Sequence, residues 1–372
     1  MSPGTYDLSV VTSGHDVADA RLHRIVAAAL REGLTVEVLG TGTAVTGPAG
    51  STVRARPRAG LVRRFMRALT LPWRAQGAVL LTLDPDAAVG AEPARRVRNR
   101  VLVVDVHEDY AALLRDRPWA GGIRGRLAGP LARLATAVAG RADLTVVADE
   151  HLPPPESACR RRLVVRNLPD LRLMGSAASP VAGDGHGLRA VYVGDVRRSR
   201  GLASMVEAVA VAPGWTLDIV GPVSRDDAGW LRERLTRTDV SGRVRLHGRQ
   251  PPEQAWQIAA GASVGLALLD DTPAFRAAVP TKVYEYLAAG MAVVASPLPR
   301  VVTLLSESGG GTVVDGAAEA GALLRRWETD GGAQLAALQD AARRWSAGHL
   351  GGETPYDVLA RELRALVLER DD

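Results

Sequence analysis

Two segments of the sequence combine residue types that suit a ligand with phosphates and neighbouring hydroxyls. In residues 280–299, a helical pattern that carries Lys282 and Glu285 ends at Gly290 and runs directly into a buried strand. A carboxylate near the carboxyl ends of parallel strands can accept hydrogen bonds from two hydroxyls, as an acidic residue does with ribose in dinucleotide-binding domains. We therefore expect Glu285 in the first turn of its helix as a ribose ligand. A solvated acid that is favoured by the helix dipole is the alternative.

The second segment, residues 190–210, ends a strand at Gly194 and opens a helix at Gly201, with an arginine-rich loop between the two glycines. Amides at a helix start and guanidinium groups both donate hydrogen bonds to the dispersed negative charge of a diphosphate. Arg197, Arg198 and Arg200 are the candidate side chains. Surface arginines on a solvated turn explain this segment equally well when it is taken alone.

Further candidates follow strands in the first half of the chain. His107 comes just after the apolar run at 101–105, and His15 and Asp16 come after the run at 8–11. Site residues often occur at the carboxyl ends of strands, but a histidine there can also simply cap a loop. The sequence has no cluster of acids with metal-ligand spacing, so we expect no metal dependence.

The elements that must position these residues alternate between short apolar runs and amphipathic stretches, an order typical of parallel sheets. Strands are expected at 8–11, 36–39, 79–83, 101–105, 144–147 and 163–165, and then at 190–193, 217–220, 244–247, 264–268, 292–295 and 312–314. Helices are expected at 18–31, 61–74, 87–98, 203–212, 228–236, 253–260 and 282–289. The chain is therefore predicted to be an α/β protein with two Rossmann-like, doubly wound parallel-sheet domains.

A stretch of small residues at 174–187 separates the two series of elements and is expected to be a linker. We assign residues 1–173 to the N-terminal domain and residues 188–340 to the C-terminal domain. Residues 341–372 are expected to be C-terminal helices, with a return to the N-terminal domain as one option.

Composition excludes several classes of protein. The 372 residues are 47% hydrophobic and 23% charged, so general disorder is excluded. The 46 basic residues exceed the 41 acidic ones, but Lys282 is the only lysine, and no basic face with interleaved aromatics suggests nucleic-acid binding. A single cysteine, Cys159, cannot form an internal disulfide. With no signal-peptide pattern and no long apolar run, we expect a cytoplasmic protein, with peripheral contact at the inner face of the membrane as an option.

Residues 61–77 predict an amphipathic basic helix, with Leu61, Phe65 and Leu69 on its apolar side beside several arginines. Interior packing with a solvated arginine face is the simpler interpretation. Weak contact with an anionic lipid surface, or with an acidic acceptor, is the minor alternative.

The motifs PTKVYEYLAAGMAVVAS and YVGDVRRSRGL, with the strand TLDIVGP and the run VRLHGRQPPEQAWQIAAGASVGLALL, resemble the donor-binding half of glycosyltransferase family 4. This family consists of retaining enzymes with the GT-B fold. The segments HDVADARLHRIVAAALREGLTVEVL and VVDVHEDY are similar to the amino-terminal domain in one bacterial branch of the family. The resemblance implies a GT-B fold in which residues 1–173 bind the acceptor and residues 188–340 bind a nucleotide-sugar donor.

The resemblance also implies roles for individual residues. Glu285 matches the glutamate that holds the nucleotide ribose, Arg200 matches the basic residue at the diphosphate, and Arg197 is expected to assist it. His107 matches a histidine that approaches the donor sugar, so His107 and Arg200 are the expected catalytic residues. The expected substrate-binding residues are Gly14, His15, Gly194, Arg197, Gly201, Arg249, Lys282 and Glu285.

Two positions depart from the family pattern. The family often has two glutamates eight positions apart, but Ala277 stands at the first of these positions. The glycine and arginine pair that usually follows the first donor-domain strand is replaced by Gly194 and Asp195.

We therefore expect a retaining, metal-independent hexosyltransferase that needs no cofactor. It is expected to transfer sugar from a UDP-linked donor to an unidentified hydroxyl acceptor in glycan or natural-product biosynthesis. The alternatives are a nucleotide-sugar epimerase of the same fold and a catalytically silent partner of a transferase. A nicotinamide-dependent oxidoreductase is disfavoured because SGHDVAD, after the first strand, lacks clustered glycines. The sequence leaves the oligomeric state open.

Overall fold

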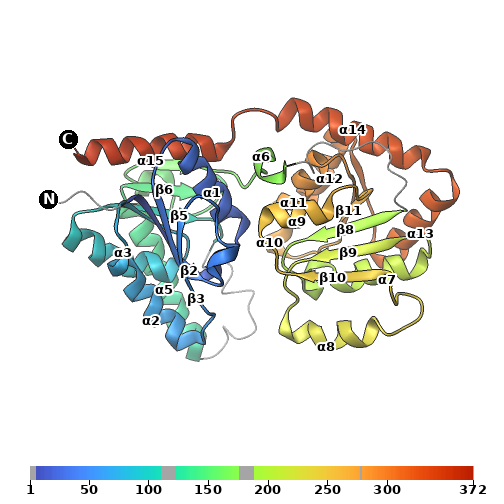
Figure 1. Ribbon diagram of the computed structural model, residues 1–372, viewed down its shortest axis with the longest axis horizontal. Helices are drawn as coiled ribbons and strands as arrows, with labels where there is room; N and C mark the ends of the chain where they lie inside the picture. Colours follow the sequence, from blue (N-terminus) through green and yellow to red (C-terminus); the bar gives the residue numbers. More distant parts are fainter. Residues whose placement is uncertain (1–5, 110–122, 176–187, 277–278, 372) are drawn as a thin grey trace. The chain divides into compact units, whose positions relative to one another are not determined.

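The chain forms two compact units, each built around its own parallel β-sheet (Figure 1). The first unit comprises Met1–Asn167 and Glu353–Asp372, and the second comprises Leu168–Gly352. The structure is a computed structural model that describes residues 6–109, 123–175, 188–276 and 279–371.

The first unit contains a seven-stranded sheet in the order β3-β2-β1-β4-β5-β6-β7, with every pair of neighbours parallel. Its strands are β1 (Tyr6–Asp16), β2 (Val36–Thr41), β3 (Thr52–Arg56), β4 (Gly77–Thr82), β5 (Val101–Val106), β6 (Leu144–Val147) and β7 (Arg162–Val164). Its helices are α1 (Ala20–Arg31), α2 (Leu61–Arg74), α3 (Pro85–Arg98), α5 (Ile123–Arg141) and α15 (Pro355–Asp371). The strand order reverses between β1 and β4, which is where doubly wound sheets bind ligands.

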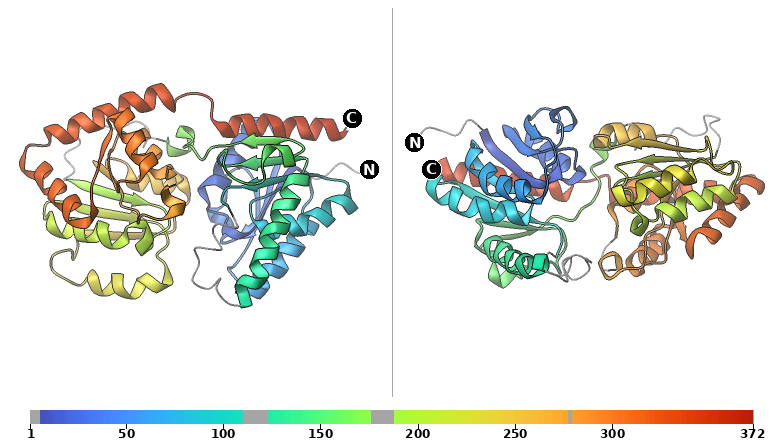
Figure 2. Two further views of the ribbon diagram at one scale, coloured as in Figure 1. Left: turned by 180° about the vertical axis from the view of Figure 1, so that it is seen from behind. Right: turned by 90° about the horizontal axis from the view of Figure 1, so that it is seen from below.

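Helices cover both faces of this sheet, as the fully buried apolar strands require (Figures 1 and 2). Helices α1 and α15 share one core with the sheet, and α2, α3 and α5 share the other. In α15, Leu359 and Leu363 are buried, and the Tyr356 hydroxyl donates a 2.7 Å hydrogen bond to Asn167 Oδ1. The chain therefore returns to complete the core of the first unit.

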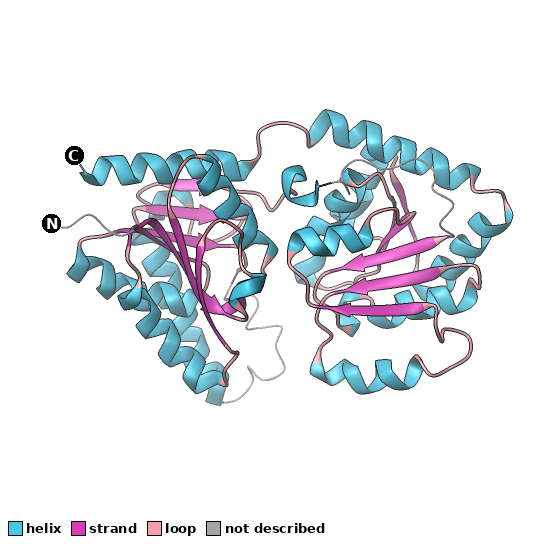
Figure 3. Ribbon diagram, in the orientation of Figure 1, coloured by secondary structure: helices cyan, strands magenta, loops and turns pink. Residues whose placement is uncertain are grey.

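The second unit contains a six-stranded parallel sheet in the order β10-β9-β8-β11-β12-β13 (Figure 3). Its strands are β8 (Arg189–Val193), β9 (Thr216–Val220), β10 (Val244–Gly248), β11 (Val264–Ala267), β12 (Ala292–Ala295) and β13 (Gly311–Val313). Its helices are α6 (Leu171–Met174), α7 (Leu202–Val211), α8 (Arg225–Arg234), α9 (Pro252–Ala259), α10 (Pro273–Arg276), α11 (Thr281–Ala288), α12 (Pro299–Ser308), α13 (Gly316–Thr329) and α14 (Ala333–His349). Here the strand order reverses between β8 and β11.

Two hydrophobic cores lie on opposite faces of the second sheet. One contains side chains of α7 and α13, where the buried indole of Trp215 donates a 2.8 Å hydrogen bond to Leu324 O. The other contains side chains of α9, α11, α12 and α14. Both domains therefore have the doubly wound architecture that the sequence pattern predicts.

The observed boundaries differ in detail from those expected. The units divide at 167 and 168, ahead of the expected end at 173, because α6 places Met174 in the core of the second unit. Helix α14 belongs to the second unit as far as His349, whereas α15 belongs to the first. Within the expected linker, residues 176–187 lie outside the described residues. Strand β3 was not expected from the sequence at all.

Candidate functional site

In the second unit, four of the expected residues lie around the end of β8. Gly194 directly follows β8, Arg200 and Gly201 connect it to α7, and Lys282 belongs to α11. Because all six strands are parallel, the loops after β8 and β11 emerge at the same edge of the sheet, beside the reversal of strand order.

Gly194 and Lys282 are in close contact. Gly194 has φ 138°, and a Cβ added there would lie 2.3 Å from Lys282 Nζ. That nitrogen is also 5.2 Å from the ring centre of Tyr192, whose hydroxyl donates a 2.8 Å hydrogen bond to Asp195 O. Glycine is therefore required after β8 both for its backbone conformation and for the approach of the ammonium group.

The arginines of the following loop differ in their partners. Arg198 Nε lies 3.2 Å from Asp227 Oδ1, and its guanidinium carbon is 4.8 Å from the ring centre of Trp230. Arg197 forms an ion pair with Asp195. Both arginines are thus already paired with carboxylates.

Arg200 has a different environment from its neighbours. Its guanidinium carbon is 5.9 Å from the ring centre of Phe275, and its buried Nε has no hydrogen-bond partner among the described residues. Burial raises the pKa of Tyr192, while the charge of Arg200 and a hydrogen bond to it oppose that rise. Arg200 therefore lies beside Tyr192, on the side of the loop where Lys282 is found.

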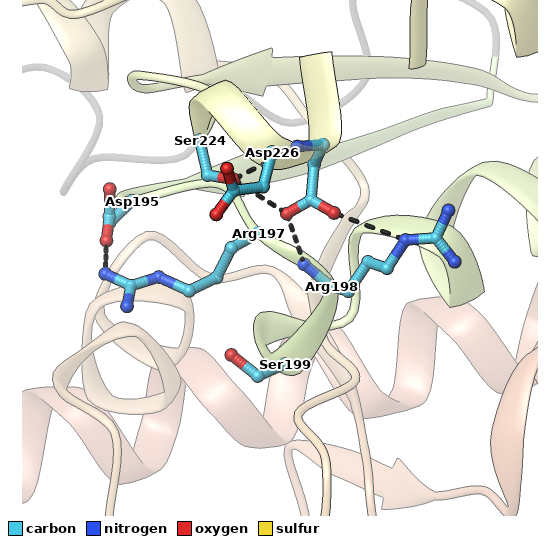
Figure 4. Close-up of a pocket in the computed structure, with 7 residues that line it drawn as sticks. Asp195, Arg197, Arg198, Ser199, Ser224 and Asp226 are labelled. Atoms are coloured by element: carbon cyan, nitrogen blue, oxygen red, sulfur yellow. Dashed lines mark hydrogen bonds and ion pairs between the residues drawn. The ribbon is translucent and has the colours of Figure 1, made fainter. Parts of the chain in front are cut away.

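A hollow between the loop after β8 and the start of α8 contains charges of both signs (Figure 4). Its lining residues are Asp195, Arg197, Arg198, Ser199, Ser224, Asp226 and Asp227. Figure 4 shows the side chains of Arg197 and Arg198 pointing in opposite directions, each towards an acid. Three carboxylates outnumber two guanidinium groups here, so this hollow is a poor place for a diphosphate.

Glu285 is buried, with 7% of its surface exposed, in the second turn of α11. The expected position in the first turn is therefore wrong, and so is the alternative of a solvated first-turn acid. The next residue fixes the helix, because the Tyr286 hydroxyl accepts a 3.1 Å hydrogen bond from Val193 N and donates a 3.4 Å bond to Leu266 O. The ring of Tyr286 also packs on Gly265, where an added Cβ would lie 2.1 Å from it.

Arg249 follows Gly248 at the end of the edge strand β10 and is half-buried. Strand β9 separates it from β8, so the two strand ends are roughly 10 Å apart across the sheet. Arg249 thus lies at the same edge of the sheet as Gly194, but farther from the reversal of strand order. Ala277 lies outside the described residues.

In the first unit, Gly14 and His15 surround the buried carboxylate of Asp84, which follows β4. Asp84 Oδ2 accepts hydrogen bonds from Thr12 Oγ1 at 2.6 Å, from Ser13 N at 2.8 Å and from Gly14 N at 3.0 Å. Asp84 Oδ1 is 2.8 Å from His15 Nδ1. β1 continues to Asp16, past the expected strand end at Val11, and its last residues are therefore closed around one anion.

His15 and Asp84 each stabilise the charged form of the other. Burial by itself lowers the pKa of His15, but the charge of Asp84 and the hydrogen bond to it raise that pKa to about 9. Burial likewise opposes ionisation of Asp84, but His15 and the donors Thr12 and Gly14 hold the pKa of the carboxyl well below its usual range. His15 is consequently an imidazolium at neutral pH, with 34% of its side chain exposed.

His107 contacts His15, their ring centres being 4.7 Å apart and their planes at 76°. Its Nδ1 is buried and lies 3.8 Å from Asp105 Oδ2, too far for a hydrogen bond, and finds no hydrogen-bond partner in the part of the chain that the structure describes. Asp105 itself is held by Arg21 through bonds of 2.7 and 2.6 Å. The structure thus brings the expected residues Gly14, His15 and His107 together.

Comparison with known proteins adds the fold family. Residues 197–353 match a family described as "Glycosyl transferase-like". The chain is similar to the crystal structure of Anabaena Alr3699/HepE in complex with UDP and glucose, at 15% identity and TM-score 0.65, with 98% of this chain and 99% of that chain covered. It is also similar to WaaG, a glycosyltransferase involved in lipopolysaccharide biosynthesis, at 13% identity and TM-score 0.64, over 96% and 99% of the two chains.

A third similar structure is sucrose-phosphate synthase from Thermosynechococcus elongatus, at 16% identity and TM-score 0.64, with 98% of each chain covered. The fold is GT-B. No curated protein sequence matches the chain. The family match lies almost wholly in the second unit of this GT-B chain and includes Arg200, Lys282 and Glu285.

The acids that organise the first unit of the GT-B chain were missed from the sequence. Asp84 and Asp105 are both buried and both stand at the ends of apolar strands, which is the signal that could have found them. The partner of Asp105, Arg21, lies in α1, and the partner of Asp84, His15, lies in β1, so both pairs join residues far apart in the sequence and give no local pattern.

Neither a cluster of metal ligands nor a membrane-spanning helix occurs within the residues that the structure describes. Within those residues, three or more histidine, cysteine, aspartate or glutamate side chains nowhere gather in a way that could hold a metal ion. None of the described helices combines the length and the apolar character that a membrane crossing requires.

Proposed function

We propose that the protein is a glycosyltransferase whose second unit binds a nucleoside diphosphate sugar. One observation carries this proposal: Glu285 is buried on the helix that also brings Lys282 against Gly194, at the reversal of strand order. This helix lies within the segment that matches the glycosyl transferase-like family. The HepE structures contain UDP, glucose or UDP-glucose, which supports a UDP-linked donor.

Groups of the second unit suit two parts of such a donor, the ribose and the diphosphate. The carboxylate of Glu285 would accept hydrogen bonds from the two ribose hydroxyls. The cations of Arg200 and Lys282 would bind the diphosphate, and the backbone amides at the start of α7 would add donors. Gly194 has no side chain and therefore leaves room for the ammonium group of Lys282 at the end of β8.

For the reaction, we propose transfer with retention, as the resemblance to family 4 implies. Breaking the bond between sugar and diphosphate places negative charge on the leaving phosphate, which Arg200 and Lys282 would stabilise. The phosphate oxygen would then take the proton of the acceptor hydroxyl, and the new bond would form on the same face of the sugar. His107 is assigned to the donor sugar on the resemblance alone. We propose no metal ion and no cofactor, since the two cations can supply the required positive charge.

A panel of UDP, GDP, ADP and dTDP sugars tests the proposal by thermal shift, followed by turnover in the presence of EDTA. A ligand that binds only the folded state raises the melting temperature, and at equal concentration a tighter ligand raises it more. We expect a UDP sugar to give the largest shift and to lose its sugar to hydroxyl acceptors or slowly to water. Inversion of the free UDP sugar would indicate an epimerase, and binding without turnover would indicate a silent partner. No shift with any member would overturn the proposal.

A further inference from the structure

Helix α2 presents an apolar surface to solvent near its start. Leu61, Val62, Phe65 and Met66 are 68%, 76%, 44% and 60% exposed. The expected interior packing holds only farther along the helix, where Ala68, Leu71 and Pro72 are buried. Four large apolar side chains within two turns are more than the scattered exposed residues of an ordinary surface.

The side chains of α2 divide into three sectors. With 3.6 residues per turn, Ala68 and Leu71 point towards the side that packs on α3. The four exposed apolar residues occupy the adjoining sector, and Arg63, Arg67 and Arg74 occupy the sector beyond them. A helix with one apolar and one basic exposed sector has the composition of helices that lie at a membrane surface.

The segment around this surface carries only positive charge of its own, although Arg54, Arg58 and Arg64 are paired with acids from other segments. Residues 54–74 contain seven arginines and no aspartate or glutamate. Arg56, Arg63 and Arg74 are exposed, and in the described ranges no acidic side chain lies within ion-pair distance of them. Such a surface attracts anionic lipid head groups, whose negative potential reaches about one Debye length.

We propose that the α2 surface, defined as Leu61, Val62, Phe65, Met66, Arg63 and Arg74, docks the protein on anionic lipid bilayers. The apolar side chains enter the boundary between head groups and acyl chains, and the arginines bind lipid phosphates. A bilayer fits better than a protein partner because exposed apolar side chains and exposed arginines occupy adjoining sectors of one helix, as in helices that lie at a membrane surface. Contact is peripheral, since the remaining side of α2 is buried against α3.

The inference does not depend on the proposed function, and lipid vesicles test it directly. The whole protein is sedimented with vesicles of phosphatidylglycerol and phosphatidylcholine in equal amounts, and with vesicles of phosphatidylcholine alone, at low and high salt. We expect binding to the anionic vesicles that is weaker at high salt and weaker still on the neutral vesicles. The double variant Leu61→Ser, Phe65→Ser should lower the partition coefficient at least about tenfold.

Arginine variants separate the charge from the apolar contribution. Arg63→Gln and Arg74→Gln should each lower binding to anionic vesicles about fivefold and leave binding to neutral vesicles unchanged. The control is Val97→Ser with Leu368→Ser, which removes exposed apolar side chains (72% and 58% exposed) elsewhere on the first unit. This control should bind vesicles like the wild type.

Three results would overturn the inference. The first is that the wild type does not bind anionic vesicles. The second is that the Val97→Ser, Leu368→Ser control loses as much vesicle binding as the Leu61→Ser, Phe65→Ser variant. The third is that the Leu61→Ser, Phe65→Ser variant binds vesicles like the wild type but differs from it in molar mass by light scattering. The last result would show a contact between protein copies. Unchanged far-UV circular dichroism and melting temperature establish that each variant is folded.

Discussion

Arg198 and Arg200 stand two residues apart in one turn, yet their neighbours give them different prospects as phosphate ligands. Arg198 is held by Asp227 and stacks on Trp230, whereas Arg200 lies beside Phe275 and has no carboxylate partner in the described part of the chain. Arg200→Ala should therefore weaken UDP binding by about 1.5 to 3 kcal/mol, the usual contribution of a hydrogen bond to a charged group. Isothermal titration with UDP measures the loss.

Arg198→Ala is the matched control for this prediction. It removes a side chain that is 56% exposed, and its surface ion pair contributes only about 0 to 1 kcal/mol to stability. UDP affinity should change little. If Arg198→Ala weakens UDP as much as Arg200→Ala does, the assignment of the diphosphate to Arg200 is wrong.

A second prediction concerns the buried carboxylate of Glu285 and the ribose hydroxyls of UDP. A buried carboxylate that reads hydroxyls leaves an unpaired acceptor when a hydroxyl is missing. Wild-type protein should therefore bind UDP more tightly than 2′-deoxy-UDP. Glu285→Gln should weaken UDP and discriminate less, since the amide keeps the volume but turns one acceptor into a donor.

A double cycle checks this, with protein and ligand changed separately and together. The two losses should sum to more than the combined loss, because both remove the same hydrogen bond. Glu253→Gln, in the first turn of α9, serves as the control. It should leave both the affinity for UDP and the preference for UDP over 2′-deoxy-UDP unchanged. Strictly additive losses would show that Glu285 does not contact the 2′ hydroxyl.

The raised pKa of His15 predicts how the stability of the protein depends on pH. Its pKa in the folded protein, about 9, lies above its ordinary value of 6.5. A raised pKa contributes stability that is fully present below pH 6.5 and is lost as the pH rises through about 9. Asp84 has the opposite sign, since its lowered pKa contributes stability that is lost only in acid.

The His15→Gln variant isolates this contribution. Between pH 6.5 and about 9, the free energy of unfolding should fall more for the wild type than for the variant. Urea unfolding at several pH values measures the difference. Parallel pH curves for the two proteins would refute the charged pair.

At the scale of elements, the sequence predicted the strands whose apolar runs are buried on both faces, such as β4 and β12. It missed β3, because this edge strand alternates between exposed and half-buried residues and carries two arginines. It also missed the exposed apolar sector of α2, since periodicity shows that a helix has an apolar side but not what that side contacts. Glu285 was assigned to the first turn because the helix was expected to start at 282, whereas it starts one residue earlier, at Thr281, and exact helix ends are set by local backbone geometry.

Within the site, the ends of apolar runs identified Gly194 and His107 correctly as residues that directly follow strands, whereas Gly14 lies inside β1, which continues to Asp16. Partners from distant segments could not be found this way. The pairing of Asp84 with His15 joins residues 69 positions apart, and the contact of Lys282 with Gly194 depends on how α11 packs on β8. Such contacts follow from the register of the sheet and the packing of helices, which no local pattern encodes.

The junction between β8 and α7 carries a prediction about an element. Gly201 caps α7 with φ 84°, and a Cβ added there would lie 2.1 Å from Leu268 O. Gly201→Ala should cost more than the roughly 1–2 kcal/mol of a left-handed alanine, because the start of α7 must also shift away from β11. UDP affinity should fall with it, since the helix-start amides move.

Gly242→Ala provides a matched comparison, because Gly242 has φ 75° with no heavy atom within 4 Å of an added Cβ. It should incur the backbone cost alone and leave UDP binding intact. Thermal melts and UDP titrations of both variants measure the two effects. Equal effects on UDP affinity would show that the position of α7 does not matter for binding.

The whole molecule consists of two units with separate cores, and the chain crosses between them twice. It leaves the first unit after Asn167 and returns at Glu353, so that α15 completes the core on α1. Tyr356 links these two parts of the first unit, because its hydroxyl donates a hydrogen bond to Asn167 and accepts a 3.4 Å hydrogen bond from Arg21. Stability of the first unit therefore depends on residues that follow the second unit in the sequence.

This dependence gives the last prediction, in which damage to α15 stays within the first unit. Leu363 is fully buried in α15, so Leu363→Ala should cost about 2–5 kcal/mol, whereas Leu368→Ala, at a position that is 58% exposed on the same helix, should cost about 0.5 kcal/mol or less. Hydrogen exchange should rise in β1 and β4 of the Leu363 variant, while peptides from β8 and α11 keep both their protection and its increase with UDP. An equal rise of exchange in β8 would show that the two units unfold together, because an independent second core has no reason to respond to a cavity in the first.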